Sequence, residues 1–144
     1  DGGPQGGQWS IDEDNRKKLP KDVDPPAMPL PRQDGVVAQV SEQVKELFPD
    51  HPGSVEGFSW PVTRQESLAW LDDFLDQRLT LFGPYEDAIS QRSKTLFHSA
   101  LSPVLNLGLI TPSDIVERTL AVFGGCRRAV QWAHDAHWVR VFWP

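Results

Sequence analysis

The sequence predicts an all-α fold, a partial helical bundle that follows a long N-terminal coil arm. Apolar residues recur at three- and four-residue steps in several segments after residue 35, as on one face of an α-helix. Helix-start signals, a Ser or Thr followed closely by Pro or an acid, open three of the later segments. No segment shows the alternation of apolar and polar residues that is typical of a half-buried strand.

The composition limits what the chain can be. Its 144 residues amount to about one domain or less. The chain has no apolar run of about 20 residues and no basic-then-apolar leader, so we expect no membrane span, no secretory signal and a cytoplasmic location. The single Cys126 excludes an internal disulfide framework and a four-cysteine zinc or iron–sulfur site. The net charge of −6 argues against a simple basic patch for nucleic acid.

The first part of the chain is predicted to be a linker. Residues 1–35 contain five Gly and six Pro, about a third of the stretch, so we expect them to run extended over a surface. Residues 36–62 are expected to form a linker helix and a connector. The helix is predicted from Gly35 to Phe48, where Pro49 ends it, on the apolar spacing of Val37, Val40, Val44 and Leu47.

The helical domain is predicted to cover residues 63–123 and to begin with a capping box. In this motif Thr63 accepts a hydrogen bond from the Glu66 backbone and the Glu66 side chain reaches back. The helix that follows is apolar on more than one side, so we expect it to lie between neighbours and to stop at Gly83 and Pro84. A short helical turn is expected over 85–90. The apolar residues of the long helix are Leu68, Trp70, Leu71, Phe74, Leu75, Leu79 and Phe82.

Two further helix starts have Pro at the first helical position. Ser102 is the predicted N-cap of a short helix that Gly108 ends, and Thr111 is the predicted cap of a helix that runs to Phe123. Asp114 places an acid near the positive end of that last helix. Residues 124–144 form a Trp-rich tail whose pattern is poorly defined.

One segment has a stated physical mechanism for binding a ligand. His98, Ser99 and Ser102 offer an imidazole and two hydroxyls just before a helix N-terminus, where free N–H groups favour an anion such as a phosphate. The alternative is that Ser102 only caps the helix. No nucleophile is paired with a base and there is no phosphate-binding glycine motif, so no catalytic residue is assigned.

The other reactive side chains have structural explanations from the sequence alone. Tyr85 beside two acids is typical of an amphipathic surface tyrosine. Asp72, Asp73 and Asp76 are expected on a solvated helix face rather than in a paired-carboxylate site. His134, His137 and Cys126 fall short of the four ligands of a structural zinc and fit no standard spacing, so no metal is predicted.

Residues 58–116 resemble the cryptochrome/photolyase family, in its prokaryotic photolyase-related branch, whose complete members carry an iron–sulfur cluster. The opening stretch, 6–16, resembles the exit from the family's antenna domain, and together the matches cover about 120 residues. The matching residues are Trp60 to Arg64, then Leu79, Phe82, Gly83, Tyr85, Asp87 and Ala88, then Leu96 to Ser99, Leu101 to Pro103, Leu105, Asn106, Gly108 to Ile110 and Pro112.

The resemblance implies a chain that leaves an α/β antenna domain, crosses a linker and enters a helical FAD-binding domain. It makes five residues the candidate contacts of FAD, near its phosphates. Complete relatives use light-excited reduced FAD to repair ultraviolet lesions, so damaged DNA is the implied partner. The candidate FAD contacts are Tyr85, His98, Ser99, Leu101 and Ser102.

The chain also departs from the family. The antenna domain and the cysteines of the iron–sulfur cluster are missing, so no cluster is expected, and residues 124–144 do not match the family's next helices. We therefore expect a fragment of a photolyase-related flavoprotein with weak or absent FAD binding and no repair activity alone. The alternative is a small non-catalytic helical module that binds a partner through its Trp-rich end. The lesion type, the antenna chromophore and the oligomeric state have no signal in the sequence.

Overall fold

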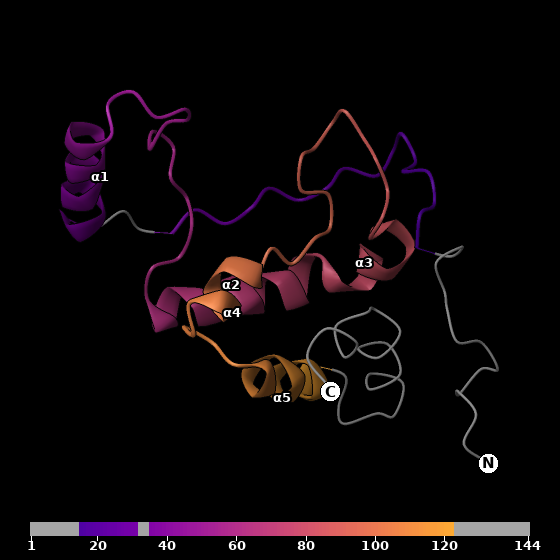
Figure 1. Ribbon diagram of the computed structural model, residues 1–144. Coiled ribbons are helices and arrows are strands. Elements are labelled where there is room, and N and C mark those ends of the chain that lie inside the picture. The colour runs from indigo at the N-terminus through magenta and orange to yellow at the C-terminus, as the bar shows by residue number, and fades with distance from the viewer. Residues whose placement is uncertain (1–14, 32–34, 123–144) are drawn as a thin grey trace, which may run out of the picture.

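The computed structural model describes residues 15–31 and 35–122, and these residues are all-α as predicted. The tail 124–144, with Cys126, His134 and His137, lies outside the described residues, as does most of the opening motif at 6–16. Five helices and no strand occur in the described part (Figure 1). The helices are α1 (Gly35–Leu47), α2 (Arg64–Gln77), α3 (Leu79–Tyr85), α4 (Ser102–Asn106) and α5 (Pro112–Val122).

Helix α1 stands apart from the other four helices (Figure 1). It ends one residue before the predicted Phe48, but none of its residues is buried. Its apolar stripe therefore faces solvent in large part: Val40 is 50% exposed and Leu47 is 71% exposed.

Helix α2 is the central element and begins as predicted. Thr63 accepts a hydrogen bond from the Glu66 amide at 3.2 Å, and the Glu66 carboxylate accepts one from the Thr63 amide at 3.3 Å. Helices α3 and α5 both pack against α2, which confirms that it lies between neighbours. The main core is formed by Trp70, Leu71, Phe74, Leu75, Leu79, Phe82, Leu101, Val104 and Ile110.

The predicted end of this long helix is wrong. The helix breaks at Arg78, whose φ of −122° leaves the helical region, and α3 then continues through Gly83 and Pro84 to Tyr85. Arg78 is fully buried, where it pairs with Asp73 of α2 and donates to the Ala27 carbonyl of the arm at 3.5 Å, and this burial accompanies the break. Pro84 is tolerated because it lies in the last turn, where its missing N–H removes a single hydrogen bond. Of the helical turn expected over 85–90, the structure has a single hydrogen-bonded turn at its start, in which the Ala88 amide donates to the Tyr85 carbonyl at 3.2 Å.

The starts of the last two helices differ in outcome. Leu101, not Ser102, is the N-cap of α4, and Ser102 is its first helical residue, with no side-chain cap. The predicted cap of α5 is confirmed, because Thr111 Oγ1 accepts from the Asp114 amide at 3.2 Å. None of the described helices has the length and apolarity needed to cross a membrane.

Over residues 15–31 the arm has neither helix nor strand, and it packs on the helical unit. Leu19 is buried in a second apolar cluster with Leu96 and Phe97, and Met28 packs against the main core. Figure 1 shows this stretch (indigo) running past α3 and α2 towards α1. The arm therefore contacts both apolar clusters of the described residues.

Candidate functional site

The candidate site is built on the loop that joins α3 to α4. Tyr85 is the last residue of α3, and its half-buried ring lies 5.6 Å from the ring of Phe97 at an angle of 33°. Phe97 is buried in the second cluster beside Leu19 and Leu96. Ring packing therefore connects Tyr85 to the segment that holds the other four predicted residues.

Two residues of this loop have unusual backbones. Leu96 has φ 47° and Ala100 has φ 51°, the left-handed region that costs non-glycine residues about 1–3 kcal/mol each. The Ser93 hydroxyl accepts hydrogen bonds from the Thr95 and Leu96 amides at 3.2 and 2.9 Å, which stabilises the approach to Leu96. Such strained residues persist only where the surroundings over-determine the loop.

The indole of Trp70 holds the middle of the loop. Its Nε1–H donates to the Ser99 carbonyl at 3.0 Å, and both residues are buried. Trp60 stacks on Trp70 with ring centroids 5.8 Å apart. The half-buried His98 lies edge-on to Phe82, with centroids 6.4 Å apart. Ser99 is thus fixed to the centre of α2 through its backbone.

Leu101 and Ser102 differ in their surroundings. Leu101 is completely buried in the main core, whereas Ser102 is exposed. Ala100 is left-handed and Leu101 is right-handed helical, with φ −86° and ψ −11°. Successive residues of opposite hand turn their N–H groups towards one side and form an anion-binding nest. This alternation of hands makes the backbone over 100–102 the candidate turn for a phosphate.

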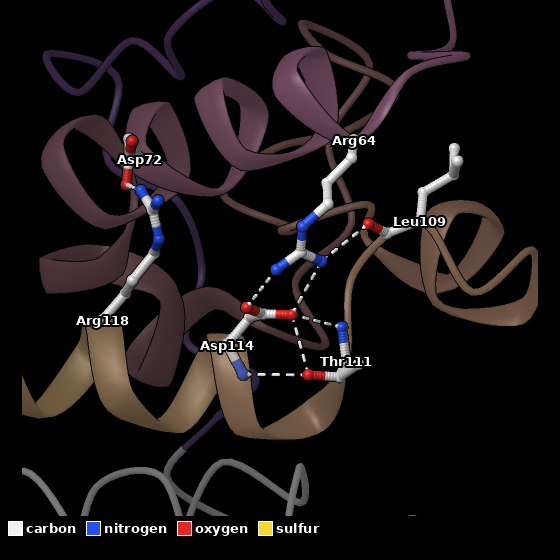
Figure 2. Close-up of polar contacts among 6 residues, drawn as sticks. All are labelled: Arg64, Asp72, Leu109, Thr111, Asp114 and Arg118. Carbon is white, nitrogen blue, oxygen red and sulfur yellow. Dashed lines mark hydrogen bonds and ion pairs between the residues drawn. The ribbon is translucent and has the colours of Figure 1, made fainter.

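The strongest electrostatic feature lies away from this loop, between α2 and α5 (Figure 2). Arg64 makes a two-pronged pair with Asp114, at 2.8 and 3.2 Å, and donates to the Leu109 carbonyl at 3.1 Å. Thr111 adds hydrogen bonds from its amide and hydroxyl to the same carboxylate, both at 2.7 Å. The Arg64 and Thr111 bonds hold the pKa of Asp114 well below its usual range. This network holds α2 against α5, and none of its side chains is a nucleophile paired with a base.

The acids of α2 are only partly on a solvated face. Asp76 is exposed as predicted, and Asp72 pairs with Arg118 of α5 (Figure 2). Asp73 departs from the prediction, because it is the partner of the buried Arg78. Over the described residues, no group of three or more His, Cys, Asp or Glu side chains is placed to hold a metal ion.

Two residues that matter for the site had no signal in the sequence. The sequence predicts Trp70 only as one of the apolar residues that widen a helix face, yet its indole N–H donates a hydrogen bond to the candidate loop. Arg92 reads as a surface cation, but it binds two backbone carbonyls of the arm, at Pro20 and Lys21. Spacing cannot reveal either contact, since the partners are 29 to 72 residues apart.

Comparison with known proteins adds two findings. The family model described as deoxyribodipyrimidine photo-lyase-related protein matches residues 1–60. The curated "(6-4) photolyase" of Agrobacterium fabrum is 37% identical over 112 residues, which cover 78% of this chain and 22% of that protein. The chain thus spans about a fifth of the length of this relative.

Proposed function

We propose that this chain, which belongs to the deoxyribodipyrimidine photo-lyase-related protein family, carries the phosphate-binding part of an FAD site. The chain corresponds to a fragment of a photolyase-related protein. In this proposal residues 1–35 are an interdomain linker, 36–62 a linker helix and connector, and 63–123 the start of the FAD-binding domain. The interaction module that uses the tail 124–144 is not favoured, because the family match begins in the arm.

The backbone at Ala100 and Leu101 is the observation that supports the proposal best. Residues of opposite hand in succession are the backbone pattern of an anion-binding nest, and the exposed Ser102 follows directly. The buried neighbours of this turn hold it in place before any ligand arrives. These groups fit the pyrophosphate of FAD, which needs hydrogen-bond donors on a prearranged backbone.

The remaining predicted residues act around this turn. Ser99 is held in position by the hydrogen bond that its carbonyl accepts from Trp70. The ring of Tyr85 packs on Phe97, and the ring of His98 packs on Phe82. When bound, the flavin supplies the light-driven electron chemistry, and the protein binds and orients it. The chain's own residues therefore bind and orient the phosphates, and none is assigned a catalytic role.

The phosphate part alone gives weak binding. Association costs several kcal/mol before any contact produces a net gain, so we expect a Kd for FAD of about 1 mM, near −4 kcal/mol. We propose that the complete protein acts as a photolyase on damaged DNA, as the Agrobacterium relative is named, and that it works in the cytoplasm. We expect no repair by the isolated 144-residue chain.

The proposal is tested by titrating the 144-residue chain with FAD and, as a matched ligand, with riboflavin, which lacks phosphate. In amide NMR spectra, FAD should shift the resonances of Ala100, Leu101 and Ser102, and riboflavin should not. Ser102→Ala should weaken the FAD response by about tenfold, since hydrogen bonds to charged groups are the stronger class. Ser54→Ala, an exposed serine in the connector, is the control and should change nothing. Equal shifts with riboflavin, or FAD shifts confined to other residues, would contradict the proposal.

A further inference from the structure

The arm contacts the candidate loop at its beginning through backbone hydrogen bonds. The Asp87 amide donates to the Asn15 carbonyl, and the Lys17 amide donates to the Pro84 carbonyl, both at 3.0 Å. The buried Asn15 side chain also donates to the Glu86 carboxylate at 3.1 Å. The loop therefore leaves α3 already bound to the arm.

Farther along, the loop reaches back to the arm through Arg92. Its guanidinium donates to the carbonyls of Lys21 at 3.0 Å and Pro20 at 2.6 Å, and pairs with Asp24 at 3.2 Å. A planar guanidinium can serve several acceptors at once because its donors have a fixed geometry. Arg92 thus provides a second attachment between the arm and the loop, farther along both segments.

Between these two attachments, the arm covers the strained part of the loop. Leu19 is buried against Leu96 and Phe97, and Leu96 is one of the two left-handed residues. Phe97 in turn packs on Tyr85. An unfavourable backbone at Leu96 persists because its side chain is enclosed, and the arm supplies part of that enclosure.

We propose that residues 15–24 of the arm are a positioning element of the phosphate-binding segment 96–102, with Leu19 and Arg92 as the positioning residues. This inference rests on the proposed function of that segment. Trp70 of α2 contacts the segment at Ser99, and the arm contacts the preceding part of the loop through Arg92. Because coupling between two sites is reciprocal, a ligand on the segment also strengthens the arm contacts. The linker is then part of the cofactor site rather than a passive tether.

The test compares Arg92→Gln with Arg118→Gln in the full 144-residue chain, without cofactor. The two arginine side chains are both 37% exposed and both pair with an aspartate, but Arg118 connects α5 to α2 and does not touch the loop. The readouts are hydrogen exchange of the Leu96 and His98 amides and the NMR resonance and exchange of the Trp70 indole N–H. Each of these groups donates a hydrogen bond within or to the loop.

We expect Arg92→Gln to speed exchange at these three groups by about tenfold and to move the indole resonance, while amides in the middle of α2 and in α5 keep their rates. Arg118→Gln should leave the three groups unchanged. Leu19→Ala, which opens the enclosure of Leu96, should reproduce the Arg92→Gln pattern. Unchanged rates at the loop, or one uniform acceleration over the whole chain, would overturn the proposal.

A flavin titration of the same proteins separates this inference from the function on which it rests. If the variants give the expected exchange pattern but the wild-type chain shows no FAD response, the arm remains a loop-positioning element and the proposed function is refuted. Wild-type and Arg92→Gln chains with equal FAD responses would overturn the positioning role at the site. A response at least severalfold weaker in Arg92→Gln supports both.

Discussion

Replacing Trp70 by Phe measures how strongly the core holds the candidate loop. The indole N–H of Trp70 is the group that donates to the Ser99 carbonyl at 3.0 Å, and both residues are 4% exposed. Phenylalanine keeps an aromatic ring on α2 but has no donor. The carbonyl then lies in the interior without its partner, which costs about 1–3 kcal/mol. The smaller ring also leaves a cavity that costs about 1 kcal/mol.

We therefore expect Trp70→Phe to lower the free energy of unfolding by about 2–4 kcal/mol. Trp60→Phe is the matched control, because Trp60 stacks on the same indole but is 40% exposed. Its loss should stay below about 1 kcal/mol, since a phenyl ring can still stack. Urea unfolding of both variants, with unchanged m-values, gives the two free energies. Equal losses in the two variants would refute a special role for the bond to Ser99.

Three further predictions concern the framework of the fold. Thr63→Ala, which removes the capping box of α2, should lower the unfolding free energy by about 1 kcal/mol in urea titrations, and an unchanged value would mean that α2 does not depend on this cap. The pKa of Asp114 is lowered in the folded state, so its contribution to the free energy of unfolding is present above the unfolded pKa of about 4 and is lost as the pH falls below it. Asp114→Asn should therefore flatten the dependence of stability on pH in that acid range, as measured by thermal unfolding at stepwise pH. Asp73→Ala leaves the buried Arg78 without its carboxylate and should lower the free energy of unfolding by about 3–5 kcal/mol. Asp76→Ala, at an exposed acid, should change it by less than about 0.5 kcal/mol. Similar losses in both variants would show that the ion pair of Arg78 does not hold the break between α2 and α3.

The starts of α2 and α5 could be predicted because a capping box is local. Thr63 and Glu66 are three residues apart, as are Thr111 and Asp114, so both partners of each motif are visible in one short window. The all-α class followed in the same way from the spacing of apolar residues. Local signals of this kind are independent of what the rest of the chain does.

The break at Arg78 could not be predicted, because the burial of that side chain is a tertiary event. Nothing in the apolar spacing separates α2 from α3, and the apolar residues Leu79 and Phe82 continue the same pattern. Gly83 and Pro84 are strong stop signals in isolation. Their cost is small at the end of a seven-residue helix, and burial of Leu79 and Phe82 in the main core offsets it.

The candidate site was predictable in its residue types and not in its shape. Leucine and alanine are not residues that favour a positive φ, so nothing marked Leu96 and Ala100 as left-handed. The prediction also treated Ser102 as the N-cap of α4, whereas Leu101 is the N-cap and Ser102 is the first helical residue. The proposed anion site therefore rests on a backbone turn rather than on a capped helix end.

Three distant parts of the chain must meet to form that turn. The Trp70 indole contacts Ser99 across 29 residues, and Arg92 contacts the arm across 71 and 72 residues. Both contacts fix a loop whose own backbone is unfavourable at two positions. Removing one contact therefore lets these strained residues relax, and its effect should be largest on the loop itself. Because the arm and the loop are in contact, a phosphate bound at 100–102 would be sensitive to changes in the linker.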